Sequence, residues 1–476
     1  MLTRNGKNVG ACLKMAKGRS FGFGGWVFLL MALGAATALA LVVAQGGRLM
    51  ATPKLGLVFV VLPAGVLVFA LICLRLPTAM RLSAAITCLS IGCSLWAFEV
   101  WLLAQKGRQG VDELVVRAKA AQVAYDARSK SEVVSDLRKA GQDAFPAVFP
   151  SLFLIPQGAK GVVRSPLNLD GGEILPLGGV PESRAVVCNE AGQWLVQDTD
   201  RNGFPNPSDV AALTSVDIAL LGDSFTQGMC VPTSTSFADR IRQVHPATLN
   251  LGNGGNGPLL ALATLIEYAR PLAPRRVLWF FFEGNDLADL NVESRSPLLR
   301  GYLVGSTAQN LTARAGHLAP LLRDYAEKSV AASQTAYAAG SALPLSQQIF
   351  RFVSLTETRI GLGLTATSIA SPDFALFGQV LTVARDQVSG WGGRLTIVYL
   401  PAWESTIQNP QAGLSEYQRV ATIIKDLGID FVDLRAEIAR HPDPIGLFPL
   451  RQAGHYAEAG HSWVADNVLT HLRERP

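Results

Sequence analysis

Three long apolar segments near the N-terminus restrict the possible folds of this chain more than any other feature. The segments are Trp26–Ala44, Leu55–Leu74 and Leu82–Ala104, and Glu99 is the only charged residue within them. A helix of about 20 apolar residues spans the hydrocarbon core of a bilayer. Three such segments in close succession are not typical of the buried helices of a soluble domain. The sequence therefore predicts three transmembrane helices.

The charges around the first apolar segment predict the orientation of the chain. Five basic residues precede that segment: Arg4, Lys7, Lys14, Lys17 and Arg19. Because basic flanks stay in the cytoplasm, we expect a multi-pass protein of the bacterial inner membrane whose chain after Gln105 lies in the periplasm. A signal peptide cleaved near Ala44 is an alternative with the same final placement, but the apolar stretch is long for that role.

Composition changes along the chain predict its domain organisation. The chain has 476 residues, of which 49% are hydrophobic, and a net charge of +5. We expect a membrane domain over 1–106, a connecting helix and loop-rich segment over 107–210, and a large soluble domain over 211–476. Much of the basic excess lies in the membrane part and its flanks. No basic tract with interleaved aromatic residues occurs in the soluble part, so nucleic-acid binding is not expected.

From Asp217 onward, short apolar runs alternate with stretches of helical pattern. The predicted strands are Ile218–Leu221, Thr248–Leu251, Arg276–Phe282, Arg394–Leu400 and Phe431–Asp433. The predicted helices are Ser236–Val244, Pro258–Tyr268, Ser415–Leu427 and Gly460–Leu472. Uniformly apolar strands separated by helices indicate a parallel sheet covered on both faces, which is the α/β class. The segment 290–385 is too long for a simple crossover and predicts a helical insertion.

Residues suited to catalysis follow the predicted strands. Loops at the carboxyl ends of parallel strands gather at one edge of the sheet. Gly222-Asp223-Ser224 follows the first strand and could present the Ser224 hydroxyl as a nucleophile, although the turn could equally cap the next helix. The Gly-rich loop after the second strand lacks dinucleotide spacing and a P-loop Lys. Asn285 follows the third strand and can donate to an oxyanion, and His455 can act as a base.

The order of these four elements resembles that of the SGNH hydrolases, also called GDSL-type esterases. The resemblance covers roughly residues 217–473 without the insertion, and it implies a flavodoxin-like three-layer α/β/α domain. It implies that Ser224 is the nucleophile and that His455 is the general base. It also implies that the backbone N–H of Gly255 and the side-chain amide of Asn285 stabilise the oxyanion.

The chain departs from this family pattern in two places. Glu283 stands where the third block usually has Gly, and Gln452 and Ala453 stand where the family places an Asp before the His. The carboxylate that orients His455 is therefore missing from its expected position. Three interpretations remain: a Ser–His dyad, a substitute carboxylate such as Asp443 or Glu283, or loss of catalysis.

The chemistry implied by the resemblance is acyl transfer through Ser224. The leading hypothesis is a membrane-anchored serine esterase or deacetylase that acts in the periplasm on an envelope polysaccharide or a lipid-linked glycan. An O-acyltransferase would use the same residues with a sugar hydroxyl in place of water. A third hypothesis is an inactive scaffold in an envelope complex. The membrane, an acylated glycan or lipid, and envelope-biosynthesis proteins are the expected partners.

Two of the six cysteines, Cys188 and Cys230, lie in the part expected outside the cytoplasm. An oxidising compartment favours a disulfide between them, and the alternative is two buried thiols. Such a bridge would join the segment before the nucleophile strand to the loop just after Ser224.

One segment resembles a calcium-binding loop. Positions 1, 3, 5 and 12 of the pattern are occupied by Asp198, Asp200, Asn202 and Asp209. The short Asp at position 12, the neighbouring prolines and the lack of flanking helical patterns favour an ordinary loop. We therefore expect no cofactor, with calcium as the alternative.

Overall fold

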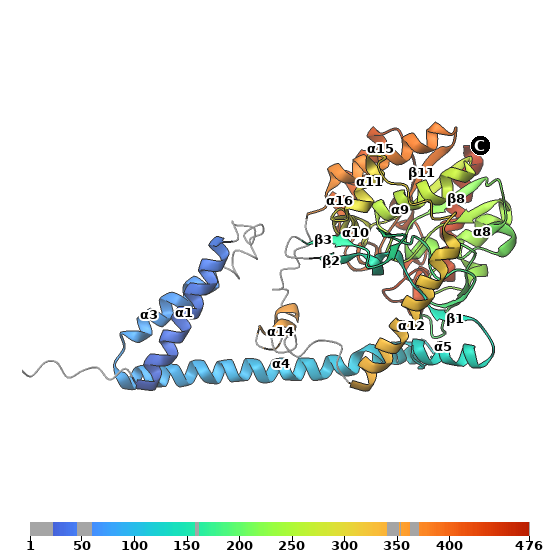
Figure 1. The fold of residues 1–476 in the computed structure, drawn as a ribbon. Coiled ribbons are helices and arrows are strands. Elements are labelled where there is room, and N and C mark those ends of the chain that lie inside the picture. The colour runs from blue at the N-terminus through green and yellow to red at the C-terminus, as the bar shows by residue number, and fades with distance from the viewer. Residues whose placement is uncertain are drawn as a thin grey trace, which may run out of the picture. The chain divides into compact units, whose positions relative to one another are not determined.

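The computed structural model describes residues 22–44, 60–157, 161–339, 352, 354–361 and 371–475. The chain forms two compact units, which are shown in Figure 1. The first unit comprises residues 1–109 and 343–368, and the second comprises residues 110–342 and 369–476.

The first unit contains the apolar helices α1 (Gly22–Ala44) and α3 (Leu62–Leu74) and the first part of α4 (Thr78–Ala120). Two stretches, Gly22–Ala40 and Thr78–Ala104, are long and apolar enough to cross a membrane. Helix α3 has 13 residues, which corresponds to about 20 Å, whereas a bilayer core is about 30 Å thick.

The prediction of three spans is therefore wrong for the described residues, which contain two candidate spans. In the second predicted segment, Leu55–Leu74, the α-helix begins at Leu62, and Val61 before it also has helical φ and ψ. Pro63 stands in the first turn of α3, where a residue without an N–H is best tolerated. Residues 55–59 of that segment lie outside the described residues.

Glu99, the charged residue in the third apolar segment, is fully buried within the first unit. Its carboxylate accepts hydrogen bonds from the backbone N–H groups of Glu357 and Thr358 and from the Thr358 hydroxyl, at 2.7–2.8 Å. Both residues belong to the short helix α14 (Thr356–Gly361). Because a buried carboxylate needs hydrogen-bond partners, these contacts explain how Glu99 is tolerated in an apolar helix.

The second unit is built on a five-stranded sheet with the order β12-β11-β10-β8-β9. All neighbouring strands are parallel. The strands are β8 (Ile218–Leu221), β9 (Thr248–Asn250), β10 (Arg276–Phe282), β11 (Arg394–Leu400) and β12 (Asp430–Asp433). In chain order this is the flavodoxin-like arrangement 2-1-3-4-5, which confirms the predicted parallel α/β sheet.

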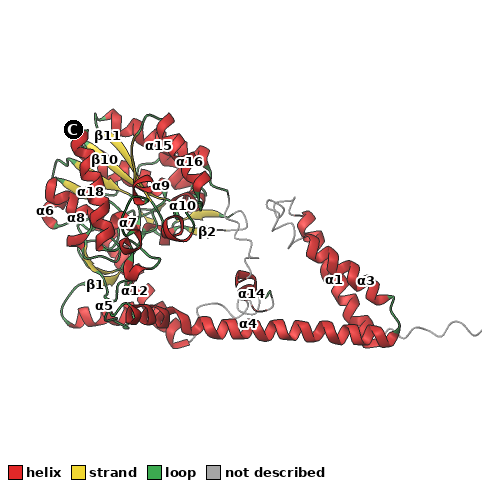
Figure 2. Ribbon diagram, turned by 180° about the vertical axis from the view of Figure 1, so that it is seen from behind, coloured by secondary structure: helices red, strands yellow, loops and turns green. Residues whose placement is uncertain are grey.

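Helices cover both faces of this sheet, as Figure 2 shows. Leu221, Trp279 and Tyr399 lie in the core of one face, together with side chains of α9, α15 and α16. Leu220 and Phe280 lie in the core of the opposite face, with side chains of α8 and α18. The helices are α8 (Phe237–Val244), α9 (Pro258–Thr264), α15 (Phe374–Gly390), α16 (Leu414–Asp426) and α18 (Glu458–Glu474). Successive strand residues point to opposite faces, so both faces are apolar and buried.

The remaining elements of the second unit are short strands and connecting helices. A three-stranded sheet consists of β1 (Ala144–Pro146), β6 (Arg184–Val186) and β7 (Val196–Asp198). Strands β6 and β7 are antiparallel and are joined by a loop that contains Cys188. The other helices include α5 (Lys130–Lys139), α6 (Ser208–Ala211), α7 (Ser224–Gln227), α10 (Asp286–Glu293), α11 (Pro297–Leu303), α12 (Ala315–Ala339) and α17 (Leu434–Ile438). The second unit also contains two antiparallel strand pairs. They are β2 (Ile155–Gln157) with β3 (Val162–Arg164), and β4 (Asn168–Leu169) with β5 (Gly172–Glu173).

Candidate active site

The turn after β8 is a tight strand-to-helix connection that presents Ser224. Gly222 has φ +148°, and a Cβ there would lie 2.3 Å from Thr226 Oγ1 and 2.7 Å from the carbonyl oxygen of Phe280. Only Gly fits this position. Asp223 is the N-cap of α7 and accepts the N–H of Phe225 at 2.9 Å. The capping role therefore belongs to Asp223, and the Ser224 hydroxyl is available for another partner.

That partner is His455, which lies in the loop before α18. Its Nε2 atom is 2.9 Å from Ser224 Oγ. The imidazole ring lies against Phe225, with 5.0 Å between ring centroids. The structure thus brings together the two residues that sequence motifs identified as nucleophile and base, although 231 residues separate them.

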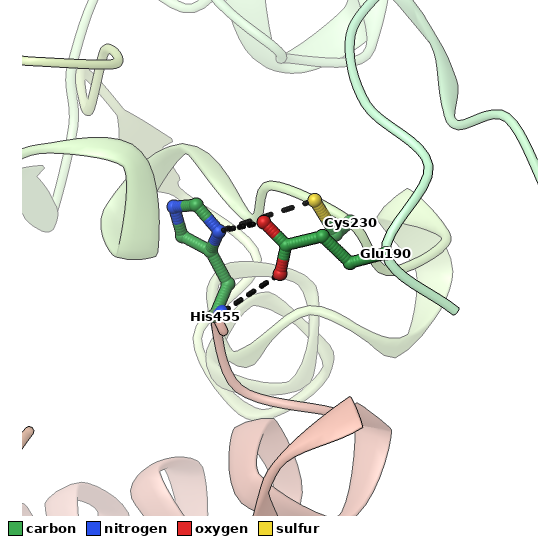
Figure 3. Close-up of side chains that lie close together, drawn as sticks. All are labelled: Glu190, Cys230 and His455. Carbon is green, nitrogen blue, oxygen red and sulfur yellow. Dashed lines mark hydrogen bonds and ion pairs between the residues drawn. The ribbon is translucent and has the colours of Figure 1, made fainter. Parts of the chain in front are cut away.

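The other nitrogen of the imidazole contacts Glu190, a residue of the β6–β7 loop. Glu190 Oε1 lies 2.8 Å from His455 Nδ1, and Oε2 accepts the backbone N–H of His455 at 2.8 Å (Figure 3). Ser224, His455 and Glu190 therefore form a continuous hydrogen-bonded chain, which we call the Ser–His–Glu triad. This is the arrangement in which a carboxylate orients a histidine and stabilises its protonated form.

Sequence reasoning missed Glu190 and named other carboxylates instead. Asp443 pairs with Arg451 at 2.7–2.8 Å on the surface. Glu283 is bound by Arg435, by the Tyr399 hydroxyl at 2.9 Å and by groups of the segment after β11. Neither carboxylate contacts the histidine. One signal could have identified Glu190, because the predicted disulfide already placed its turn beside the nucleophile loop.

The triad residues influence one another's ionisation. Burial acts to lower the pKa of His455, but the hydrogen bond and charge of Glu190, together with the charge of Asp223, outweigh burial and raise that pKa above its ordinary value. Burial acts to raise the pKa of Glu190, but its bonds to His455 outweigh burial and lower that pKa. The site therefore favours an ionised Glu190 beside a histidine that holds its proton more strongly than usual.

The predicted oxyanion residues lie at the same sheet edge. Gly255 has φ +69°, and a Cβ there would lie 2.5 Å from Ser151 Oγ. The preceding residue, Gly254, donates its N–H to Gln227 Oε1 at 2.9 Å, which ties the Gly-rich loop to α7. The positive φ and the nearby Ser151 side chain favour glycine at position 255. The role of its N–H as an oxyanion donor stays a prediction.

Asn285 occupies the N-cap position of α10 at the end of β10. Its Nδ2 donates to Asp289 Oδ2 at 2.8 Å, and an amide nitrogen carries a second hydrogen that this bond does not use. Burial and the charge of Asp223 raise the pKa of Asp289 to about 7. The role of Asn285 in an oxyanion hole also stays a prediction.

The predicted disulfide between Cys188 and Cys230 is present, with a Cα–Cα distance of 5.5 Å. Cys230 Sγ lies 4.0 Å from His455 Nδ1 (Figure 3). Glu190, Cys230 and His455 are the one group of potential metal ligands that converge among the described residues. Because the Cys230 sulfur is bonded to Cys188, it is not available as a thiolate ligand.

The calcium-loop residues are not brought together around a common point. Asp200 accepts the N–H groups of Asn202 and Phe204 and the amide of Asn206. Asp198 pairs with Arg184 instead. Asp209 is exposed in helix α6. The carboxylate of Asp200 closes a turn through three hydrogen bonds, and the calcium alternative stays a prediction.

A surface cavity of about 520 Å³ lies beside the two loops that the disulfide joins. Its lining includes Ala191, which follows Glu190, and Cys230. Trp194 and Glu458 contribute aromatic and acidic surface. Ser224 itself is 9% exposed, and it does not line this cavity.

Comparisons with known proteins found likeness only among solved structures. No protein-family model matches the chain, and no curated protein matches it. A lipase/acylhydrolase from Enterococcus faecalis has 12% identity and a TM-score of 0.32, over 55% of this chain and 96% of that one. The acetyl xylan esterase AlAXEase has 12% identity and a TM-score of 0.31, over 54% and 98%. A putative G-D-S-L lipolytic protein from Desulfitobacterium hafniense has 15% identity and a TM-score of 0.29, over 53% and 98%. Function is therefore inferred from the residues and geometry of the chain itself.

Proposed function

We propose that this protein is a serine esterase of the SGNH type that works through an acyl-enzyme intermediate. The observation that carries the proposal is the hydrogen-bonded chain from Ser224 Oγ through both nitrogens of His455 to Glu190. The four motifs in SGNH order, and a sheet with the order 2-1-3-4-5, support the same assignment. Glu190 supplies the carboxylate that was missing, which removes the main reason to regard the domain as an inactive scaffold.

The proposed reaction begins when Ser224 Oγ attacks the carbonyl carbon of an ester. His455 Nε2 takes the hydroxyl proton, and Glu190 holds the Nδ1–H and stabilises the imidazolium. The tetrahedral intermediate then collapses, and His455 gives its proton to the departing alcohol. A water molecule, deprotonated by His455, attacks the acyl-enzyme and releases the acid. In a transferase, a sugar hydroxyl would take the place of this water.

The negative charge of the tetrahedral intermediate needs donors in fixed positions. We assign this role to the backbone N–H groups of Ser224 and Gly255 and to the Asn285 amide. Asp289 accepts one N–H of the Asn285 amide, which leaves the other for the oxyanion. Fixed donors of this kind stabilise charge without reorganisation during the reaction.

The proposed location is the periplasmic side of a bacterial inner membrane, with an acylated envelope glycan or lipid-linked glycan as substrate. Two helices long and apolar enough to span a membrane support the anchoring. The disulfide supports an oxidising compartment. No cofactor is needed for the proposed chemistry, because the triad and the oxyanion donors supply every group that it uses.

Labelling with a fluorophosphonate probe tests the assignment of the nucleophile. The full-length protein in detergent should be labelled, and Ser224→Ala should abolish the labelling. Ser389→Ala, which changes an exposed serine at the end of α15, should not alter it. Labelling that persists in Ser224→Ala, or that is absent from the wild type, would contradict the proposal. Turnover of a small acetyl ester, with and without glycan acceptors, then separates hydrolase from transferase.

A further inference from the structure

We propose that the Cys188–Cys230 disulfide positions Glu190 against His455, so that the complete triad exists only in the oxidised protein. The inference rests on the proposed function and assigns Cys188 and Cys230 as positioning residues. Neither sulfur takes part in the reaction. The bridge acts through Glu190, whose carboxylate sets the orientation and the proton affinity of the catalytic base.

The bridge connects the two loops that carry the triad. Glu190 is two residues after Cys188, and Cys230 is six residues after Ser224. The disulfide therefore closes the acid-bearing loop directly onto the loop that follows the nucleophile. Cys230 Sγ reaches to 4.0 Å from His455 Nδ1, the nitrogen that faces Glu190. The covalent link thus lies at the junction of acid and base.

The Glu190 carboxylate has few other restraints. Within the described residues, its hydrogen bonds are those to the Nδ1 and the backbone N–H of His455. Its side chain is 28% exposed, so water can replace these bonds if the loop moves.

The rest of the turn is anchored independently of the bridge. Asn189 Nδ2 donates to the carbonyl oxygen of Asp126 at 2.9 Å, and Asn189 Oδ1 accepts the N–H of Gly192 at 3.0 Å. The carbonyl oxygen of Gly192 accepts the N–H of Asp126 at 2.7 Å. None of these bonds involves the Glu190 side chain. Loss of the disulfide should therefore leave the turn folded and loosen only the contact with His455.

Reduction provides a direct way to open the bridge. A dithiol reductant breaks the S–S bond in two thiol–disulfide exchanges, leaves two cysteine thiols and is itself oxidised to a cyclic disulfide. What remains is a Ser–His dyad. Because the hydrogen bond and charge of Glu190 raise the pKa of His455, the dyad should also have a histidine that loses its proton at lower pH.

The test compares kcat, KM and the pH profile of four full-length proteins: wild type, Glu190→Gln, Cys188→Ser/Cys230→Ser, and the triple variant. We expect the double cysteine variant to lose about ten-fold or more in kcat, with little change in KM. The acidic limb of its pH–activity profile should move to lower pH, and the same shift is expected for Glu190→Gln. The kcat of the triple variant should match that of Glu190→Gln within about two-fold. The cysteine changes and Glu190→Gln remove the same interaction, the contact between Glu190 and His455, so their effects should not add.

Other outcomes overturn the inference. If the losses multiply in the triple variant, or if kcat falls while the acidic limb stays in place, the disulfide has only a structural role. If the wild type shows neither turnover nor Ser224-dependent labelling, the proposed function itself fails. Cys93→Ser, a change at a cysteine outside the bridge, should behave as wild type.

Reversible reduction of the wild type tests the inference even if the cysteine variants misfold. Activity should fall on treatment with a dithiol and return after reoxidation, with unchanged circular dichroism throughout. A chelator must be present, because a freed Cys230 thiolate beside Glu190 and His455 could bind a divalent metal. Full activity in the reduced protein would refute the inference.

Discussion

The carboxylate oxygen Oε1 of Glu190 lies 2.8 Å from Nδ1 of His455, although the two residues are 265 positions apart in the chain. The contact joins a small three-stranded sheet to the loop that precedes the last helix. It adds a carboxylate to the Ser224–His455 pair, so the histidine has an acidic partner although no Asp stands just before it in the chain.

Replacement of Glu190 by Gln should lower kcat by about 10²- to 10⁴-fold, because the amide can neither fix the required tautomer nor stabilise the imidazolium. Steady-state kinetics on a small ester will measure the effect. Asp443→Asn is the matched control, since Asp443 pairs with Arg451 at the surface. Equal losses in both variants would remove Glu190 from the mechanism.

The pH dependence of kcat/KM should show an acidic limb above the ordinary histidine value of about 6.5. Neutral His455 is the active base, and its pKa is raised in the folded protein. Activity should therefore rise with pH through this raised pKa and be lost below it. In Glu190→Gln, burial becomes the dominant influence and lowers the pKa, so the limb should move to lower pH. A limb that moves upward or not at all would contradict this assignment.

Asn285→Ala should lower kcat by about 10²- to 10³-fold with little change in KM, because an oxyanion donor acts mainly in the transition state. Asn467→Ala, on the partly buried face of α18, serves as a control. An increase in KM with unchanged kcat would instead assign Asn285 to substrate binding.

Glu283→Gln should destabilise the second unit by about 3 kcal/mol, because it leaves the buried Arg435 guanidinium without its carboxylate. The two side chains are 7% and 10% exposed. Thermal unfolding in detergent should show a lower midpoint for this variant and an unchanged one for Asp443→Asn. A Glu283→Gln protein with wild-type stability would show that the pair is not needed for folding.

Chelation should leave both the thermal midpoint and the esterase activity unchanged. Asp200 has already accepted three hydrogen bonds from neighbouring groups, so the loop holds its shape without an ion. A calcium-dependent increase in the midpoint after exhaustive chelation would restore the calcium-loop interpretation.

Much of the fold can be predicted because it depends on local patterns. The strands 218–221, 276–282 and 394–400 coincide with the predicted ones, since an apolar run buried on both faces leaves a clear signal. The turn at Gly222 depends on one residue type, so these features are determined by residues close together in the chain. The disulfide was predicted differently, from the two cysteines in the part expected outside the cytoplasm.

The identity of the triad carboxylate was decided by the tertiary structure alone. Asn189-Glu190-Ala191-Gly192 reads as an ordinary turn, and only the neighbouring Cys188 distinguishes Glu190 from Asp443 or Glu283 in the sequence. Only the folding of β6 and β7, and the bridge from Cys188 to Cys230, place this carboxylate against His455. The sequence by itself predicted the sheet and named Ser224 and His455 as candidate nucleophile and base, because the strand and motif signals are local. The acid depends on a contact between distant segments, which no local pattern encodes.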